Sequence, residues 1–210
     1  MRLAELDAVT IDAYGTLVRL TGPVPELQMG LAALGVEHDA EAVGLAFARE
    51  SAYYREHSFE GRDEASLYDL RLRCVAIILD ELGSDLEPAA FVDGFVAAMR
   101  FELLPDAGAA LQKLRRHGLA VAVVSNWDVG LAQHLGGLGL GLGDVTVVTS
   151  AQAGAPKPDP AVFTLALELL GVQASRALHV GDSDADEAGA SAAGMQFAPA
   201  PLAQAVEALT

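Results

Sequence analysis

Hydrophobic and polar positions follow two different patterns along the chain. Between about residues 22 and 103, apolar residues recur every three or four positions, in segments separated by Gly, Pro or Asp. Within the segment 64–83, Leu67, Leu70, Cys74 and Ile77 fall at helical spacing and would form one buried stripe. No strand-like run interrupts this part of the sequence, which therefore predicts a small bundle of helices.

After Pro105 the pattern changes to strands that alternate with helices. Apolar runs at about 119–126, 145–150 and 177–183 predict strands, as does a run at 8–12 that precedes the helical segment, and a short edge strand is expected at 195–198. Fully apolar strands separated by helices are typical of a parallel sheet that is covered on both faces. We therefore predict an α/β core formed by residues 1–19 and 104–210, with residues 20–103 inserted as a helical domain.

Polar residues follow each of the predicted core strands. Because ligands of parallel sheets bind beyond the carboxyl ends of the strands, we expect these side chains to meet at one edge. They are Asp12, Tyr14 and Thr16 after the first strand, Ser125 and Asn126 after the second, Lys157 before the helix that follows the third, and Asp182 and Asp186 after the fourth. One such residue could simply cap a helix, but polar residues at all four strand ends indicate a functional site.

The residue types at this edge suit phosphoryl transfer. Asp12 and Asp182 would repel each other unless a cation lay between them, and carboxylate oxygens are ligands that Mg²⁺ prefers. Lys157 adds a compact positive charge, and Ser125 adds a hydroxyl that can face an anionic group. These residues predict an electrostatic mould for a phosphoryl transition state, in which Asp12 is the nucleophile and forms an aspartyl-phosphate.

Four short motifs in this order resemble the haloacid dehalogenase superfamily of hydrolases. They are DAYGTL at 12–17, SN at 125–126, KPDP at 157–160 and GDSDAD at 181–186. The resemblance covers essentially the whole chain, and it implies a Rossmann-like core with an inserted helical-bundle cap. It also implies that Asp12, the backbone carbonyl of Tyr14 and Asp182 are metal ligands, with Asp186 supporting the metal.

The same resemblance implies how the substrate is held. Ser125 and Asn126 would contact the transferred group, Lys157 would balance its charge, and Thr16 would lie in the substrate-binding loop that carries the nucleophile. Arg62 lies in a loop of the helical segment and is a candidate for binding an anionic substrate.

Tyr14 departs from the pattern of the phosphatases in this superfamily, which usually have a second Asp at that position as general acid and base. A phenol with a pKa of about 10 can donate a proton but is a poor base at neutral pH. We therefore expect slow phosphatase activity, or the use of another group such as water, Asp128 or a cap residue. Tyr at this position also resembles the 2-haloacid dehalogenases, but those enzymes lack the carboxylate of Asp182 and tend to have Tyr where this chain has Phe163.

Charge and composition narrow the possible partners. The formal net charge of −16 argues against nucleic acid or an anionic membrane surface, and a small anionic substrate at a locally positive site is expected instead. The single cysteine, the acidic N-terminal segment and the lack of a membrane-length apolar run predict a cytoplasmic protein. His179, inside an apolar strand, is interpreted as a core histidine with satisfied hydrogen bonds. The alternatives to a phosphatase are a dehalogenase and a weakly active member that binds a phosphorylated ligand.

Overall fold

The computed structural model describes residues 2–139 and 145–209, and the chain divides into two compact units. We call Met1–Arg19 together with Phe101–Thr210 the α/β unit, and Leu20–Arg100 the helical unit. The two connections between the units run through a two-stranded sheet formed by β2 (Val18–Leu20) and β3 (Phe101–Leu103).

Strand β3 corrects one expectation from the sequence. The prediction that no strand occurs in this segment up to residue 103 is wrong, because the last helix of the segment ends at Ala98 and residues 101–103 are extended. Phe101 and Leu103 are partly buried and Glu102 between them is exposed, which is the two-residue period of a strand. Glu102 pairs with Arg19 of the neighbouring strand at 2.5 Å.

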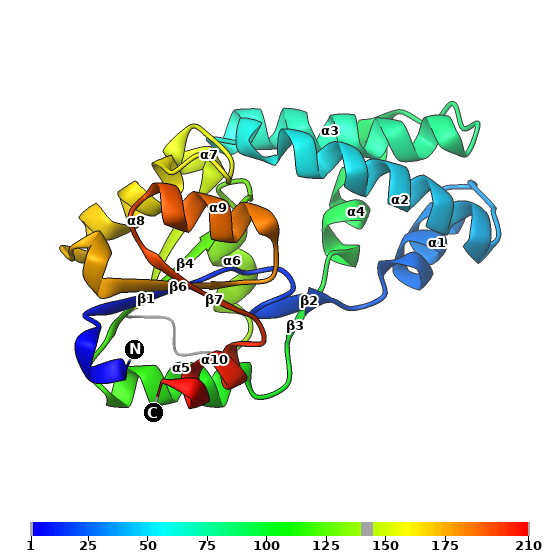
Figure 1. Ribbon diagram of the computed structural model, residues 1–210. Coiled ribbons are helices and arrows are strands. Elements are labelled where there is room, and N and C mark those ends of the chain that lie inside the picture. The colour runs from blue at the N-terminus through cyan, green and yellow to red at the C-terminus, as the bar shows by residue number, and fades with distance from the viewer. Residues whose placement is uncertain (1, 140–144, 210) are drawn as a thin grey trace. The chain divides into compact units, whose positions relative to one another are not determined.

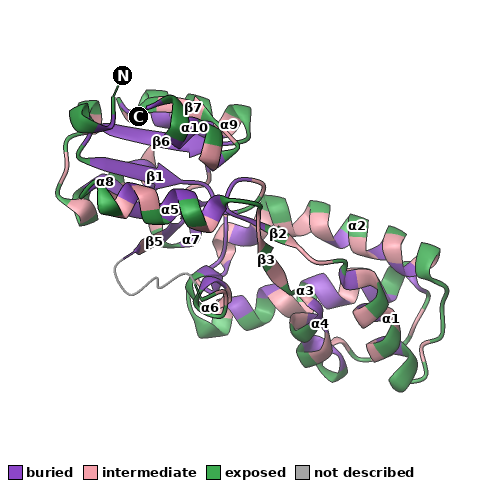
Figure 2. Cartoon of the chain, turned by 90° about the horizontal axis from the view of Figure 1, so that it is seen from below, coloured by how far each residue is buried: buried purple, intermediate pink, exposed green. Residues whose placement is uncertain are grey.

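Five parallel strands form the sheet of the α/β unit, in the order β5-β4-β1-β6-β7. Their bounds are β1 Ala8–Ile11, β4 Ala120–Ser125, β5 Thr146–Thr149, β6 Ala177–Gly181 and β7 Gln196–Pro199. Every residue of β1 and β6 is buried (Figure 2). The predicted α/β class with a parallel sheet is thus confirmed, and the central position of β1 places Asp12 beside the ends of β4 and β6.

Helices cover both faces of this sheet (Figure 1). Helices α8 (Ala161–Leu170) and α9 (Asp184–Ala192) lie on one face, and α5 (Ala107–Arg116) and α10 (Leu202–Ala208) lie on the other. Val124, Val148 and Phe163 are fully buried in the core of the first face. The unit also contains η1 (Leu3–Glu5), α6 (Leu131–Gly136), α7 (Ser150–Ala153) and η5 (Ala174–Arg176).

The helical unit packs amphipathic helices around a core of its own. Its elements are α1 (Pro23–Ala33), α2 (Ala40–His57), η2 (Ser58–Glu60), α3 (Glu64–Glu81), η3 (Pro88–Ala90) and α4 (Val92–Ala98). Asp39 and Asp63 cap α2 and α3 by accepting hydrogen bonds from backbone N–H groups at 2.8 Å. The buried stripe of α3 continues from Cys74 to Ile78 rather than to Ile77. Residues four positions apart in a helix lie on the same face, and Ile78 stands four positions after Cys74.

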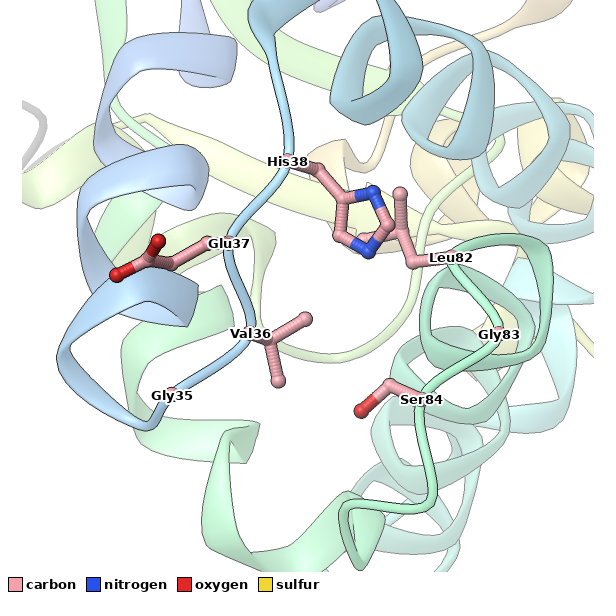
Figure 3. A pocket seen from close by; sticks show the side chains of 7 residues that line it. All are labelled: Gly35, Val36, Glu37, His38, Leu82, Gly83 and Ser84. Atoms are coloured by element: carbon pink, nitrogen blue, oxygen red, sulfur yellow. The ribbon is translucent and has the colours of Figure 1, made fainter.

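One pocket of the helical unit contains none of the residues that the sequence predicts to carry chemistry. Residues 35–38, between α1 and α2, and residues 82–84, after α3, line this pocket (Figure 3). Among the residues that the structure describes, no helix is both long and apolar enough to cross a membrane.

Candidate active site

Asp12 is the first residue after β1, and it forms hydrogen bonds with three other residues. Its backbone N–H donates to the carbonyl of Val180 at 2.9 Å, which ties the end of β1 to β6. Its carboxylate is buried, and Oδ1 accepts hydrogen bonds from Ser125 Oγ at 2.9 Å and from Lys157 Nζ at 2.6 Å. Oδ2 takes no part in these bonds, so one oxygen of the carboxylate stays available for other chemistry.

Lys157 is a buried ammonium between two carboxylates. Nζ lies 2.6 Å from Oδ1 of Asp12 and 2.5 Å from Oδ1 of Asp186, and it also donates to the carbonyl of Val124 at 3.3 Å. Burial by itself would lower the pKa of this lysine, but the charges and hydrogen bonds of the two carboxylates outweigh it and hold the pKa above its usual value. Lys157 is therefore charged at neutral pH and bridges the predicted nucleophile to α9.

Asn126 fixes the backbone of Lys157. Its Oδ1 accepts from the N–H of Lys157 at 2.7 Å, and its Nδ2 donates to the carbonyl of the same residue at 3.2 Å. The side chain thus anchors the loop before α8 to the end of β4. Contact between Asn126 and the transferred group stays a prediction.

Asp186 accepts four hydrogen bonds from three residues. Oδ1 accepts from Lys157 and from His179 Nε2 at 2.9 Å, and Oδ2 accepts from the backbone N–H and the hydroxyl of Ser183, at 3.1 Å and 2.5 Å. Burial alone would raise the pKa of Asp186, but these donors and the charge of Lys157 hold it well below its usual range. The carboxylate is ionised and its hydrogen-bonding capacity is filled.

Asp12, Asp182 and Asp186 together form a cluster of oxygens that could hold a cation. Each offers one carboxylate oxygen, and these oxygens lie within 4.8 Å of one another. Burial and the negative charges of Asp12 and Asp186 raise the pKa of Asp182, which is the repulsion that a cation would relieve. A set of carboxylates with one exposed member fits Mg²⁺, which keeps part of its water shell. Asp12 and Asp182 are the better ligands, because Asp186 already serves four donors.

A model of the haloacid dehalogenase-like hydrolase family matches residues 6–194 of the chain. The chain belongs to the haloacid dehalogenase-like hydrolases. The resemblance inferred from the four motifs is thereby confirmed, and the protein is a hydrolase.

Three known proteins illustrate this membership. Haloacid dehalogenase-like hydrolase domain-containing protein 3 of Bos taurus is 33% identical over 229 residues, which cover 97% of this chain and 86% of the relative. Phosphoserine phosphatase of Thermus thermophilus is 34% identical over 166 residues, which cover 75% of this chain and 65% of the relative. A solved L-2-haloacid dehalogenase shares the fold, with a TM-score of 0.71 at 21% identity over 97% of this chain and 98% of that structure.

The first motif of this hydrolase forms a tight loop after Asp12. Gly15 N–H donates to the carbonyl of Val18 at 2.9 Å, and Val18 N–H donates to that of Ala13 at 2.8 Å. The carbonyl of Tyr14 lies outside these two bonds, so the loop leaves it available as the predicted metal ligand. The phenol side chain of Tyr14 is 53% exposed, whereas Thr16 is buried and its hydroxyl has no hydrogen-bond partner among the described residues.

The hydrogen bonds described so far do not include two further candidates, Asp128 and Arg62. Asp128 is buried after β4, and its Oδ1 accepts from the N–H of Gly130 at 2.6 Å, which stabilises the turn before α6. Arg62 belongs to the helical unit, where it precedes α3 with an exposed side chain and a backbone N–H bonded to Ser66. The roles suggested for both residues stay predictions.

Three residues to which the sequence assigned no role in the site shape it. Gly15 makes room for Asp182, Ser183 binds Asp186, and His179 binds the same carboxylate from β6. The interpretation of His179 as a satisfied core histidine agrees with its two hydrogen bonds, yet one of its partners is a site residue. A titratable residue two positions before Gly181, in an otherwise apolar strand, was the available signal.

Proposed function

We propose that this hydrolase is a Mg²⁺-dependent phosphatase that acts on a small phosphorylated molecule. The observation that carries the proposal is the position of Lys157 Nζ between Asp12 and Asp186, next to a carboxylate cluster suited to Mg²⁺. A positive charge and a hydroxyl beside the nucleophile favour an anionic group that is being transferred. The likeness to a phosphoserine phosphatase supports the same reaction class.

Asp12 is the proposed nucleophile because only one of its two carboxylate oxygens accepts hydrogen bonds from Ser125 and Lys157. Oδ1 is oriented by Ser125 and Lys157, so Oδ2 is the oxygen that attacks phosphorus. The bond from phosphorus to the leaving oxygen breaks, and an aspartyl-phosphate forms. Water then attacks phosphorus, the bond to Asp12 breaks, and inorganic phosphate is released.

Two groups of residues stabilise the charge that develops in these steps. Lys157 keeps its ammonium beside Asp12, and Ser125 supplies a hydroxyl donor from the end of β4. Asp12, Asp182 and the carbonyl of Tyr14 would hold Mg²⁺, which when bound supplies positive charge to the phosphoryl oxygens. Asp186 supports this arrangement through its bond to Lys157.

Tyr14 sets the limit of the proposed activity. The usual acid–base Asp is absent from this position, and general acid–base catalysis typically contributes about 10²–10⁴-fold to the rate. Substrates whose leaving group departs without a proton should therefore react best. We infer from this that turnover is slow for alkyl phosphates.

The same fold also occurs in an L-2-haloacid dehalogenase, and Tyr14 is the feature of this chain that favours that reaction. In a dehalogenase Asp12 would attack carbon and displace a halide. Asp182 argues against it, because a carboxylate beside the nucleophile repels charge unless a cation balances it. A weakly active member that only binds a phosphorylated ligand would use the same charged groups.

One paired assay separates these three functions. Phosphate release from p-nitrophenyl phosphate is measured with and without Mg²⁺, and chloride release is measured from 2-chloropropionate. Mg²⁺-dependent phosphate release that disappears in Asp12→Asn supports the proposal. Metal-independent chloride release would show a dehalogenase, and inorganic phosphate binding without either product would show a binding protein.

The helical unit is proposed to act as a cap that supplies substrate contacts, with Arg62 as the first candidate. Arg62→Ala should raise KM for a phosphorylated substrate and leave kcat nearly unchanged. The half-buried Arg71 of the same unit, as Arg71→Ala, provides the control for a general loss of positive charge. Equal KM values in the two variants would show that Arg62 does not bind the substrate.

A further inference from the structure

Two polar side chains, Thr10 and His179, are fully buried within the central strands of the sheet. They are register partners on β1 and β6. Thr10 Oγ1 lies 2.8 Å from His179 Nδ1, and His179 Nε2 lies 2.9 Å from Oδ1 of Asp186. Burying polar groups is unfavourable unless they are hydrogen-bonded, and apolar residues could fill the same space. We therefore look for a role of Thr10 and His179 beyond filling the core.

The partners of the imidazole decide where its proton lies. Ionised Asp186 can only accept hydrogen bonds, so His179 Nε2 must be the donor in this contact. Burial lowers the pKa of His179, the positive charge of Lys157 lowers it further, and the hydrogen bond to Asp186 only partly opposes these effects. In an imidazole that carries its proton on Nε2, Nδ1 is an acceptor, and the Thr10 hydroxyl donates to it.

The hydrogen bonds of these residues form one continuous chain that begins at Thr10 in β1 and ends at Asp12, the residue that follows β1. Thr10 donates to His179, His179 donates to Asp186, and the same oxygen of Asp186 accepts from Lys157, which also donates to Asp12. Asp12 follows β1 directly and continues its pairing with β6, and a step of two residues in extended backbone keeps the side chains of Thr10 and Asp12 on the same face. The nucleophile is thus connected to the interior of the sheet through groups that are all buried.

We infer that His179 is a positioning residue for phosphoryl transfer, which fixes the Asp186 carboxylate so that Lys157 remains bonded to Asp12. The inference rests on the function proposed above. Lys157 has a long flexible side chain, and its ammonium faces two carboxylates that compete for it. The Nε2–H donor balances part of the charge on Asp186 and prevents rotation of that carboxylate.

Aromatic packing keeps the donor aligned. The imidazole meets the ring of Phe163 edge-to-face, with ring centroids 4.8 Å apart and an angle of 79° between the planes. The ring of Phe197 lies 6.3 Å away on the neighbouring strand β7. These contacts, together with the bond from Thr10, restrict the ring to one orientation, in which Nε2 points to Asp186.

The first test needs no catalytic activity. In protein labelled with ¹⁵N at histidine, two-dimensional NMR at pH 7 reports which ring nitrogen of His179 carries a proton, and His179→Gln assigns the signal. A proton on Nε2 supports the inference, with and without Mg²⁺. A ring whose Nε2 carries no proton overturns it, because that ring cannot donate to Asp186.

The second test compares kcat and KM for p-nitrophenyl phosphate at saturating Mg²⁺. His179→Phe keeps the ring volume and removes the donor, and its kcat should fall about 10–100-fold with KM changed less than about threefold. In His179→Gln the amide nitrogen can replace Nε2, so most of the kcat should return. Asn is too short to reach Asp186, so His179→Asn should stay as slow as His179→Phe.

Urea unfolding of each variant separates positioning from folding. A folded His179→Phe with the kcat of the natural protein would overturn the inference, as would equal kcat values for the Gln and Asn variants. If His179→Phe does not fold, the comparison of the Gln and Asn variants decides alone. If the unaltered protein releases no phosphate, the proposed function fails, and the NMR result still decides the position of the proton.

Discussion

A Cβ atom at position 15 would lie only 2.0 Å from Oδ2 of Asp182. Gly15 also has φ of +83°, in the left-handed region where other residues are strained. The loop after Asp12 can therefore bring its backbone against the Asp182 carboxylate only because residue 15 has no side chain. This close approach helps to place the oxygens of Asp12 and Asp182 in one cluster.

Gly15→Ala should therefore damage the site more than the fold. The left-handed backbone costs an alanine roughly 1–2 kcal/mol, and the methyl group must in addition displace Asp182 or the loop. We expect phosphate release to fall at least about tenfold, with a higher Mg²⁺ concentration at half-maximal rate.

Gly118→Ala is the matched control, because Gly118 has φ of +74° and no atom within 4 Å of its Cβ position. Both variants should lose stability in urea unfolding, Gly15→Ala at least as much as Gly118→Ala, and only Gly15→Ala should lose activity. A Gly15→Ala protein with normal kinetics would show that the approach of Asp182 is not needed.

Mg²⁺ should stabilise the folded protein through Asp182. A ligand at a hundred times its Kd stabilises the state that binds it by about 2.7 kcal/mol, so Tm should rise with Mg²⁺ concentration. Asp182→Asn should abolish this rise, because the cluster loses one of its charged oxygens.

Asp184 provides the control for this thermal experiment. It belongs to the same motif and is exposed, but its carboxylate is not a member of the oxygen cluster. Asp184→Asn should keep the Mg²⁺-dependent rise in Tm. Equal responses in the two variants would place the cation elsewhere.

Tyr14→Asp should create the general acid and base that the first motif lacks. The gain should depend on the leaving group, because phenolate needs a proton on departure more than p-nitrophenolate does. We expect kcat for phenyl phosphate to rise by about 10²-fold or more, with a smaller rise for p-nitrophenyl phosphate.

Tyr14→Asn separates proton transfer from the removal of a bulky ring. Asn opens the same space at this 53% exposed position but has no carboxyl group to exchange a proton. It should therefore show no comparable gain in kcat. Equal rates for the Asp and Asn variants would mean that acid–base catalysis does not limit turnover.

Glu50→Gln should stabilise the protein at neutral pH. Glu50 is buried in the helical unit, and burial raises its pKa above the usual 4.5, although hydrogen bonds from Cys74 and Ser51 and the charge of Arg55 oppose the shift. Because the folded state favours the protonated carboxyl group, Glu50 contributes fully to stability below about pH 4.5. This stabilising contribution is lost as the pH rises through the folded-state pKa of Glu50, where the buried carboxyl group must ionise. The amide avoids that loss because it never ionises.

Urea unfolding at several pH values measures this difference. Glu50→Gln should be more stable than the natural protein at pH 7, and the advantage should disappear below about pH 4.5. Glu56→Gln, an exposed residue of the same helix, should show no such trend. An advantage of Glu50→Gln that is the same at every pH would exclude ionisation as its cause.

The spacing of apolar residues along the sequence was sufficient to predict most of the fold. The runs that became β1, β4 and β6 are mostly apolar and buried, which is typical of strands in a sheet covered on both faces. The short strand β3 was missed because three residues, Phe101–Leu103, give too little alternation to be separated from the preceding helix. Ile77 was expected in the buried stripe of α3, but it is only partly buried and Ile78 is fully buried, since neighbouring isoleucines both fit a helical stripe.

The sequence by itself determined which residues carry charge at the strand ends, because residue types and their order are sufficient to identify Asp12, Lys157, Asp182 and Asp186. It could not show that Lys157 bridges Asp12 and Asp186.

Only the tertiary structure decided the partners of these groups. Thr10 and His179 are 169 residues apart in the chain, and parallel pairing of β1 with β6 makes them neighbours. Local patterns report which face of an element is buried, whereas a hydrogen bond between distant residues depends on strand register and on how helices cover the sheet. The packing of β6 and α9 therefore turned a core histidine into a hydrogen-bond partner of Asp186 in the candidate site.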